Sequence, residues 1–271
     1  MLINGCDYPT PFAVDEKSIR QWADRRTGIG FDQLLIIDNP SQSSVDFDYR
    51  IYNADGSESA QCGNGARCVA RFVSEKGLTD KKTIRVRTVE RIIEITIQDD
   101  NSIAVDMGSA VFDPELIPFN SAGLLAVGER IEKKMYTVKS AALEIYFGTV
   151  SFGNPHAVIK VEDINTVPIA EIGAVLQTHS CFPASVNVSF VEAREDVLHA
   201  RVYERGAGET PSCGSGACAV AVIAHVQGWI PQTLDLVPVR LVGGLLNIRF
   251  EKDRIKLVGP AESVFEGLIK I

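Results

Sequence analysis

Short runs in which apolar and polar residues alternate recur along the chain and predict a protein rich in β-strands. These runs are enriched in β-branched and aromatic residues and are bounded by turn-forming residues, which is typical of strands. The predicted strands are Asp32–Ile37, Phe47–Tyr52, Thr83–Arg87, Ile92–Ile97, Ser102–Met107, Leu143–Thr149, His156–Val161, Asn187–Glu192, His199–Tyr203 and Leu245–Phe250.

Four other segments place their apolar residues at helical spacing. They are Ser18–Arg25, Gly65–Val73, Ile169–Gln177 and Gly216–Ala224. The last of these is apolar nearly all round, which predicts a buried helix. Many strands and few helices indicate the α+β class, with sheet wrapped around each central helix.

The chain contains an internal repeat at a separation of 151 residues, without gaps. Residues 50–70 and 201–221 share nine identities, which in the first copy are Arg50, Tyr52, Glu58, Cys62, Gly63, Gly65, Ala66, Val69 and Ala70. In each copy a strand leads through a polar loop to Cys-Gly-x-Gly-Ala, which opens a helix. The repeat therefore predicts two pseudo-symmetric domains, with Cys62 or Cys213 at the start of a helix.

We expect an N-terminal half over residues 1–110 and a C-terminal half over residues 111–258. The segment Gly108–Pro118 contains two prolines and is the expected crossing between the halves. Residues 259–271 are expected to form a strand that returns to the N-terminal half.

Composition narrows the range of partners. The 271 residues are 45% hydrophobic and 23% charged, which is typical of a globular protein with a full core. The net charge of −8 argues against nucleic acid or an anionic membrane as the main partner. We see no secretion signal and no apolar run of about 18 residues, so we expect a cytoplasmic protein.

Six cysteines without a Cys-x-x-Cys pair indicate reduced thiols rather than a zinc ribbon or a thioredoxin-type site. Cys6, Cys68, Cys181 and Cys218 are interpreted as small buried residues. The segment Gly214–Ala219 fits the G-x-G-x-x-A dinucleotide fingerprint. That fingerprint directly follows a strand, whereas a polar loop intervenes here, so we reject it. We expect neither a metal nor a cofactor.

The two repeated cysteines suit proton transfer at a single carbon. Inversion of an amino acid's α-carbon requires a base on one face and an acid on the other. A helix N-terminus lowers the pKa of a thiol and binds anions, here the α-carboxylate. The flanking glycines let the backbone approach that carboxylate. The pattern predicts a cofactor-independent amino-acid epimerase in which Cys62 and Cys213 exchange the roles of acid and base.

These motifs resemble those of the diaminopimelate epimerase family from Ile19 onward. The motifs are Gly30–Leu35, Asn53–Ser57, Gln61–Arg67, Gly153–His156, Val186–Val188 and Val202–Thr210. The resemblance implies two pseudo-symmetric β-barrels, each around a central helix. It also implies a homodimer that interconverts LL- and meso-2,6-diaminopimelate in lysine and peptidoglycan biosynthesis.

Carried over residue by residue, the resemblance makes Cys62 and Cys213 the acid–base pair. It implies that the reacting carboxylate binds the backbone at Gly63, Asn64, Gly214 and Ser215. It implies that the substrate's distal amine and carboxylate bind Asn53, Asn154, Asn187, Glu204 and Arg205, with Gln33 nearby. A guanidinium suits a bidentate carboxylate contact, and a glutamate suits an ammonium. His156 either supports the site by tuning a cysteine or is a packed histidine.

The sequence departs from the family in two places. The family's first strand and its Gly-Asn-Asp-Phe motif would fall upstream of Met1, and Asn4–Asp7 does not replace that motif. Glu90-Arg91 stands where the family usually has Asn-Gly, which predicts a different hairpin turn.

Three alternatives remain. A proline-racemase-like or phenazine-isomerase-like relative would share the fold, but proline offers no distal groups for Glu204 and Arg205. An inactive, truncated form that only binds its ligand would follow from the missing N-terminal motif. A thiol-redox protein is disfavoured because the chain lacks a Cys-x-x-Cys pair.

Overall fold

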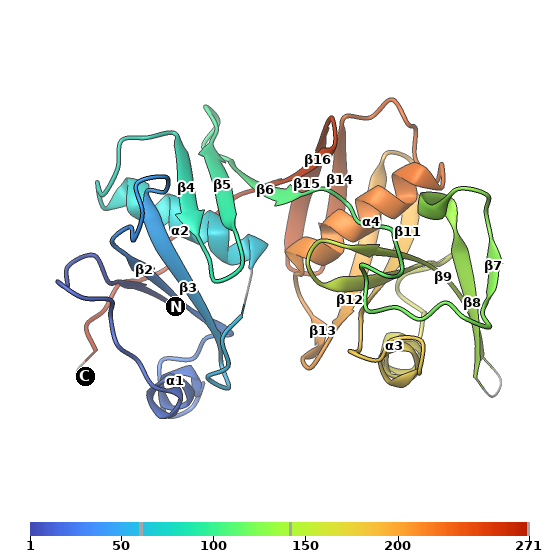
Figure 1. Cartoon of the computed structure of the whole chain (residues 1–271), viewed down its shortest axis with the longest axis horizontal. Helices are drawn as coiled ribbons and strands as arrows, with labels where there is room; N and C mark the ends of the chain where they lie inside the picture. Colours follow the sequence, from blue (N-terminus) through green and yellow to red (C-terminus); the bar gives the residue numbers. More distant parts are fainter. Residues whose placement is uncertain (60–61, 141–142, 270–271) are drawn as a thin grey trace. The chain divides into compact units, whose positions relative to one another are not determined.

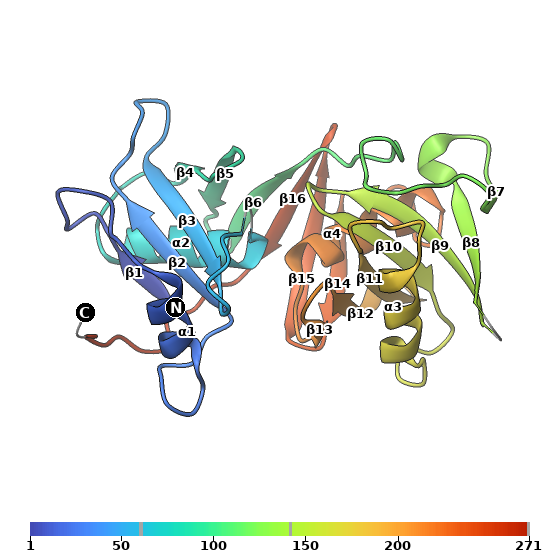
Figure 2. The same ribbon diagram turned by 60° about the horizontal axis from the view of Figure 1, so that its bottom comes forward.

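The computed structural model describes residues 1–59, 62–140 and 143–269, and the chain divides into two compact units. Unit 1 contains Met1–Asp106 together with the segment that starts at Gly259, and unit 2 contains Met107–Val258. Figures 1 and 2 show the helices and strands of each unit from two directions. Gln61, the first residue of one predicted motif, lies outside the described residues.

Unit 1 combines a mixed sheet with two helices. In chain order its elements are β1 (Leu2–Asn4), α1 (Glu16–Ala23), β2 (Gln33–Asp38), β3 (Phe47–Asn53), α2 (Gly63–Glu75), β4 (Thr83–Arg87), β5 (Ile92–Ile97) and β6 (Ile103–Gly108). The strands lie side by side in the order β1-β2-β3-β4-β5-β6. The pairs β1–β2 and β3–β4 are parallel and the others antiparallel.

Strand β2 is buried on both faces, which explains its continuous apolar run. Leu34 and Ile36 pack with Ile19 and Trp22 of α1. Leu35, on the other face, reaches the first turn of α2, whose apolar face is fully buried. Strand β2 therefore lies between the two helices of the unit and helps to fix the start of α2.

Unit 2 is built from a longer mixed sheet and two further helices. Its elements are β7 (Leu125–Val127), η1 (Ile131–Lys133), β8 (Met135–Ser140), β9 (Leu143–Ser151), β10 (Pro155–Lys160), α3 (Ile169–Thr178), β11 (Asn187–Arg194), β12 (Val197–Glu204), β13 (Gly208–Thr210), α4 (Gly214–Val226), β14 (Leu236–Leu241), β15 (Gly244–Glu251) and β16 (Arg254–Gly259). The strand order is β16-β15-β14-β12-β11-β10-β9-β8-β7, and β13 pairs with β12.

Helix α4 is the central helix of unit 2. It packs against β9, β10, β11, β12, β14 and β15, as Figure 1 shows, and ten of its residues are buried. Helix α3 packs against β11, β12 and β13, and its buried residues belong to a core that includes Phe147, Phe182 and Phe190. The prediction of an α+β fold with sheet wrapped around a central helix is confirmed.

The strands before the two cysteines pair in the same way in both units: β3 is antiparallel to β2 and parallel to β4, and β12 is antiparallel to β11 and parallel to β14. In unit 1, Leu34 of β2 lies opposite Tyr52 of β3, and in unit 2, Val188 of β11 lies opposite Tyr203 of β12. Tyr52 and Tyr203 are themselves a repeated pair in the sequence. The repeat thus extends from the Cys-Gly-x-Gly-Ala motif into the sheet that supports it.

The strand predicted over residues 259–271 is wrong for the part of the segment that the structure describes. Strand β16 ends at Gly259, and residues 260–269 form neither helix nor strand. The carbonyls of Pro260 and Ala261 accept hydrogen bonds from Arg67 and Arg71 of α2, at 3.1 and 3.0 Å. These carbonyls are bound by arginine side chains rather than by a neighbouring strand, and proline has no N–H to donate.

Two of the cysteines interpreted as buried residues are not. Cys181 and Cys218 are buried, but Cys6 is only half-buried and Cys68 is exposed. The buried stripe of α2 runs through Ala66, Val69, Ala70 and Val73, so Cys68 lies off that stripe.

The residues around Glu90 form a turn closed by the Thr88 N–H, which donates to the Arg91 carbonyl at 2.8 Å.

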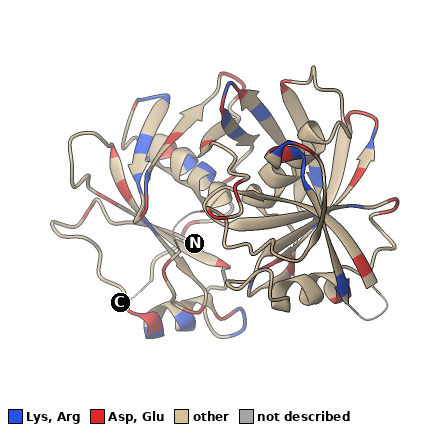
Figure 3. Cartoon of the chain, turned by 45° about the vertical axis from the view of Figure 1, so that its right-hand side comes forward, with Lys and Arg blue, Asp and Glu red and all other residues tan. Residues whose placement is uncertain are grey.

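Charged residues of both signs are interspersed along the strands, as the colours in Figure 3 show. Several form opposite-charge pairs, such as Arg87 with Asp48 and Arg201 with Glu209. Among the residues described, none of the helices combines the length and the apolar character needed to cross a membrane.

Candidate functional site

Cys62 is the N-cap of α2. Its backbone is extended, and its sulfur accepts a hydrogen bond from the Gly65 N–H at 3.1 Å. An N-cap side chain thereby satisfies one of the amides that have no partner within the helix. The half-buried sulfur lies in the positive field at the start of α2, next to the backbone of Gly63 and Asn64. This is the backbone expected to bind a carboxylate.

Gln33 and Asn53 lie side by side at the ends of β2 and β3. The Gln33 side-chain amide donates to Asn53 Oδ1 at 3.1 Å, and Asn53 Nδ2 donates to the Ser57 hydroxyl at 3.1 Å. Both residues are half-buried. The sheet register thus brings these two predicted residues of unit 1 together as one amide pair.

Cys213 caps α4 in the same way, with its sulfur 3.4 Å from the Gly216 nitrogen, but it is only 5% exposed. Burial, and after it the Glu204 carboxylate, raise the pKa of the Cys213 thiol well above its usual range. The Gly216 N–H and the Ser215 hydroxyl act in the opposite direction and are outweighed. The expectation that a helix N-terminus lowers the thiol pKa is therefore wrong for Cys213, which holds its proton.

A chain of polar contacts leads from Cys213 into the sheet. Its sulfur lies 3.7 Å from the Ser215 hydroxyl, which accepts from Asn154 Nδ2 at 3.1 Å. Asn154 Oδ1 lies 3.2 Å from His156 Nε2. Because a carbonyl oxygen only accepts, His156 donates through Nε2.

His156 is fully buried beneath α4. Burial, with a smaller contribution from the Arg205 charge, lowers the pKa of His156 to about 3. The imidazole is therefore neutral at physiological pH. It reaches Cys213 through Asn154 and Ser215 rather than by direct contact.

Asn187, Glu204 and Arg205 lie together where β11 begins and β12 ends. The buried Asn187 accepts from the Arg205 N–H at 2.9 Å and donates to the Pro155 carbonyl at 3.3 Å. Both hydrogen bonds hold the backbone, so in this structure Asn187 positions Arg205. One guanidinium nitrogen of Arg205 donates to the Ala184 carbonyl at 3.0 Å, and the side chain is otherwise exposed.

Two residues near these clusters were not predicted as part of a site. The Thr210 hydroxyl donates to the Glu204 carboxylate and so orients it. Tyr49, on β3, places its hydroxyl under the first turn of α2. Both residues look structural in the sequence. Thr210 comes two residues after a predicted loop glycine, and Tyr49 stands at an alternating position of a predicted strand. Only the fold places them beside Glu204 and Cys62.

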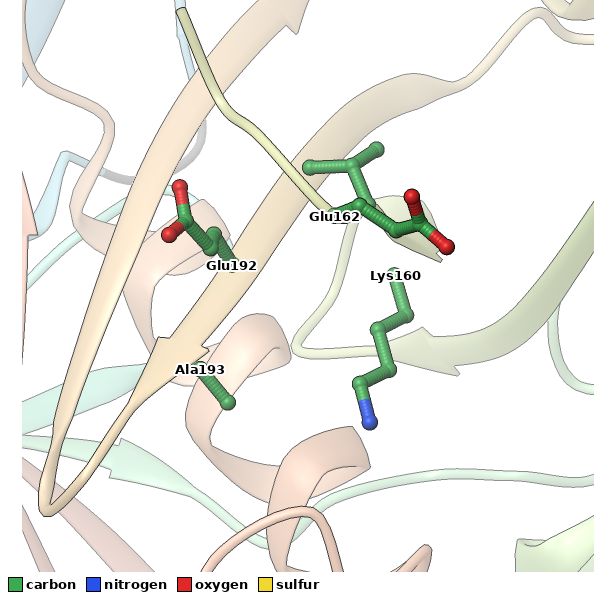
Figure 4. Close-up of a pocket in the computed structure, with 5 residues that line it drawn as sticks. Lys160, Glu162, Glu192 and Ala193 are labelled. Atoms are coloured by element: carbon green, nitrogen blue, oxygen red, sulfur yellow. The ribbon is translucent and has the colours of Figure 1, made fainter.

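An open depression on unit 2 lies away from these residues. It is lined by Lys160, Val161, Glu162, Glu192 and Ala193, and Figure 4 shows the Lys160 and Glu192 side chains pointing in different directions. The Lys160 ammonium lies 5.5 Å from the Trp229 ring, which follows the C-terminal end of α4, whereas Cys213 caps its N-terminal end. Among the described residues, no three His, Cys, Asp or Glu side chains cluster as metal ligands would.

The chain matches the model of the diaminopimelate epimerase family over residues 7–112 and 148–264. It is 48% identical over 258 residues to the diaminopimelate epimerase of Pseudomonas syringae pv. syringae (strain B728a), which covers 94% of this chain and 90% of that protein. It is 46% identical over 262 residues to the diaminopimelate epimerase of Azotobacter vinelandii, with coverages of 95% and 91%.

Solved structures share the fold at much lower identity. A hydroxyproline epimerase from Agrobacterium vitis superposes with a TM-score of 0.63 at 16% identity, covering 89% of this chain and 77% of that one. A phenazine biosynthesis protein of the PhzF family from Bacillus anthracis has a TM-score of 0.61 at 18% identity, with coverages of 94% and 90%. At such identities these structures support the fold alone. The family match and the close relatives, which extend over nearly the whole chain, show that this chain belongs to the diaminopimelate epimerase family.

Proposed function

We propose that this chain interconverts LL- and meso-2,6-diaminopimelate by proton transfer between the substrate and two thiols, those of Cys62 and Cys213. The observation that carries the proposal is the equivalent placement of the two cysteines. Each caps the central helix of its unit, and each sulfur accepts from the N–H three residues along, that of Gly65 or Gly216. The relatives named diaminopimelate epimerase, which are nearly half identical, support the choice of substrate.

The reaction begins when one thiolate removes the α-proton. The electron pair of the C–H bond then delocalises into the α-carboxylate, where the amides at the starts of α2 and α4 stabilise the developing charge. The second thiol gives its proton to the opposite face of the carbon, so the configuration inverts. Because burial and Glu204 hold the proton on Cys213, we assign Cys213 as the thiol and Cys62 as the thiolate of the resting enzyme.

The distal end of the substrate carries an ammonium and a carboxylate. We assign the carboxylate to the Arg205 guanidinium and the ammonium to the Glu204 carboxylate, because opposite charges and bidentate geometry match. Asn53, Asn154 and Asn187, with Gln33, complete the predicted substrate contacts. We further propose that the enzyme acts in the cytoplasm as a homodimer, in lysine and peptidoglycan biosynthesis.

The test is incubation with LL-diaminopimelate in deuterated water, with deuterium at the α-carbon measured by mass spectrometry and the isomers separated by chromatography. Cys62→Ala and Cys213→Ala should each lower the epimerisation rate by roughly 10²–10⁴-fold, since each removes one acid–base group. Cys68→Ala is the matched control, because Cys68 is an exposed thiol on the same helix as Cys62, and it should epimerise at the unaltered rate.

Two results would contradict the proposal. The first is absence of α-deuterium and of meso product with the unaltered protein, which would favour an inactive binding protein. The second is a normal rate in both directions with either cysteine replaced, which would exclude the two-thiol mechanism.

A further inference from the structure

The buried hydroxyl of Tyr49 has no hydrogen-bond partner among the residues that the structure describes. Tyr49 is 1% exposed and belongs to β3, the strand that leads to the Cys62 loop. Buried hydroxyls are nearly always paired, so an unpaired one at a candidate active site requires an explanation.

The hydroxyl lies next to the sulfur of Cys62. Tyr49 Oη is 2.5 Å and Cys62 Sγ is 3.1 Å from the point that a Cβ atom would occupy on Gly65. The oxygen and the sulfur are therefore no farther apart than the sum of those two distances. Any side chain at position 65 would displace one of the two groups, and this explains the glycine.

The hydroxyl is able to act as a donor here. Burial, and after it the charges of Cys62 and Cys68, raise the pKa of Tyr49 well above its usual range, so the phenol keeps its proton. A thiolate accepts several hydrogen bonds, and Cys62 Sγ already accepts one from the Gly65 N–H. The thiolate has the capacity for a second hydrogen bond, and the Tyr49 hydroxyl lies beside the same first turn of α2.

In the second unit the hydroxyl beside the cysteine comes from another position, because Ser215 Oγ lies 3.7 Å from the Cys213 sulfur. Ala200 occupies the position that corresponds to Tyr49 in the repeat. The space beside Gly216 is filled by the Val202 methyl group and by Cys213 itself. A carboxylate, that of Glu204, acts on Cys213 instead. Cys62 therefore has a buried hydroxyl beside it, whereas at Cys213 burial and the Glu204 carboxylate outweigh the Ser215 hydroxyl.

We propose that Tyr49 is a positioning residue whose hydroxyl donates a hydrogen bond to the Cys62 thiolate, and so keeps the negative charge on Cys62 when no substrate is bound. Its part in catalysis rests on the proposed epimerase function, but the hydrogen bond itself does not. The two can therefore be tested separately.

Other titratable groups lie around Cys62. The Met1 amino group, which donates to the Gln33 carbonyl at 2.8 Å, interacts with Cys62, Cys68 and Asp32. These groups are identical in the unaltered protein and in Tyr49→Phe. A difference in the titration of Cys62 between the two proteins therefore measures the effect of the Tyr49 hydroxyl.

The first experiment measures the rate of alkylation by iodoacetamide against pH, without substrate. The reagent reacts with the thiolate, and trypsin separates Cys62, in peptide 51–67, from Cys68, in peptide 68–71. In Tyr49→Phe we expect the midpoint of Cys62 alkylation to rise by about one pH unit. Tyr52→Phe is the matched control, because Tyr52 lies on the same strand but packs against the core on the α1 side, and it should leave the midpoint unchanged.

The second experiment separates this role from a structural one. Tyr49→Phe should lower kcat about tenfold at pH 7 and much less at pH 9, with KM unchanged. Its melting temperature should be equal or higher, because the substitution removes an unpaired buried hydroxyl and leaves the ring. A lower melting temperature with an unchanged pH profile would make Tyr49 a packing residue and overturn the proposal.

The alkylation result also distinguishes the two proposals. An unchanged Cys62 midpoint, or a shift that appears at Cys68 instead, would overturn the role of Tyr49 even in an active epimerase. A shifted Cys62 midpoint in a protein without epimerase activity would support the hydrogen bond and refute the proposed function alone.

Discussion

His156 should make the stability of unit 2 depend on pH in the weakly acidic range. In the unfolded chain a histidine has a pKa of about 6.5. In the folded protein, burial and the Arg205 charge lower the pKa of His156 to about 3. Below pH 6.5 the imidazole of His156 therefore binds a proton in the unfolded state but not in the folded state. The folded state has its full stability above pH 6.5 and loses stability as the pH falls towards 3.

The size of the effect follows from the two pKa values. Between pH 7 and pH 5 the free energy of unfolding should fall by about 2 kcal/mol on account of this residue alone. The result is insensitive to the folded value, because any pKa well below 5 leaves the folded imidazole neutral at pH 5. Carboxylates titrate in the same range, so the residue must be isolated by a variant.

Urea unfolding of the protein and of His156→Gln, each at pH 7 and pH 5, provides the measurement. Trp22 lies in unit 1 and Trp229 in unit 2, so in a Trp22→Phe background fluorescence follows unit 2. The protein with His156 should lose about 2 kcal/mol more than the variant on acidification. Between pH 7 and pH 8 the two should behave alike. An equal loss at pH 5 in both proteins would refute a neutral, buried His156.

Three further outcomes are expected. Gly65→Ala should lower the rate of α-proton exchange by at least about tenfold, because the new Cβ would lie 2.5 Å from the Tyr49 hydroxyl and 3.1 Å from the Cys62 sulfur. An unchanged rate would mean that the placement of these two groups beside Gly65 does not affect the exchange. Asp38→Ala should lower the free energy of unfolding, measured in urea, by about 2–3 kcal/mol. The substitution removes the carboxylate that pairs with Arg50, whose side chain is 26% exposed, and that accepts from the buried Phe12 N–H. Dialysis against a chelator should leave the exchange rate unchanged, and a loss restored by added metal would contradict the thiol mechanism.

Much of the fold follows from local patterns. The alternation in Phe47–Tyr52 and Thr83–Arg87 corresponds to β3 and β4, because each strand buries one face and exposes the other. Strands of three residues, such as β1 and β7, were not predicted, since no period can be read from so few positions. Strand β14 was not predicted because it contains Pro238, and a proline normally argues against a strand.

Tertiary contacts decided what local patterns could not. Residues 260–269 form no strand, and two arginines of α2, nearly two hundred residues earlier, bind the carbonyls of Pro260 and Ala261. The N-caps at Cys62 and Cys213 follow from the repeated motif, whereas the neighbours of each sulfur do not. In the sequence, Tyr49 cannot be distinguished from any other buried strand residue. Only the fold shows that its hydroxyl lies beside Gly65, at the first turn of α2.

The differences between the two repeats bear on how the proposed reaction turns over. Inversion requires one thiolate and one thiol, and two equivalent cysteines would share the single proton equally between both arrangements. The hydrogen bond proposed for Tyr49 and the carboxylate of Glu204 would both favour charge on Cys62 and the proton on Cys213. Each turnover reverses that arrangement, because Cys62 has then taken the α-proton and Cys213 has given up its own. A preference of several pH units would leave almost no enzyme with a Cys213 thiolate, the form from which the reaction in the other direction starts. The hydrogen bond from Tyr49 alone would contribute a preference of about tenfold, which favours one arrangement while still allowing the other to form.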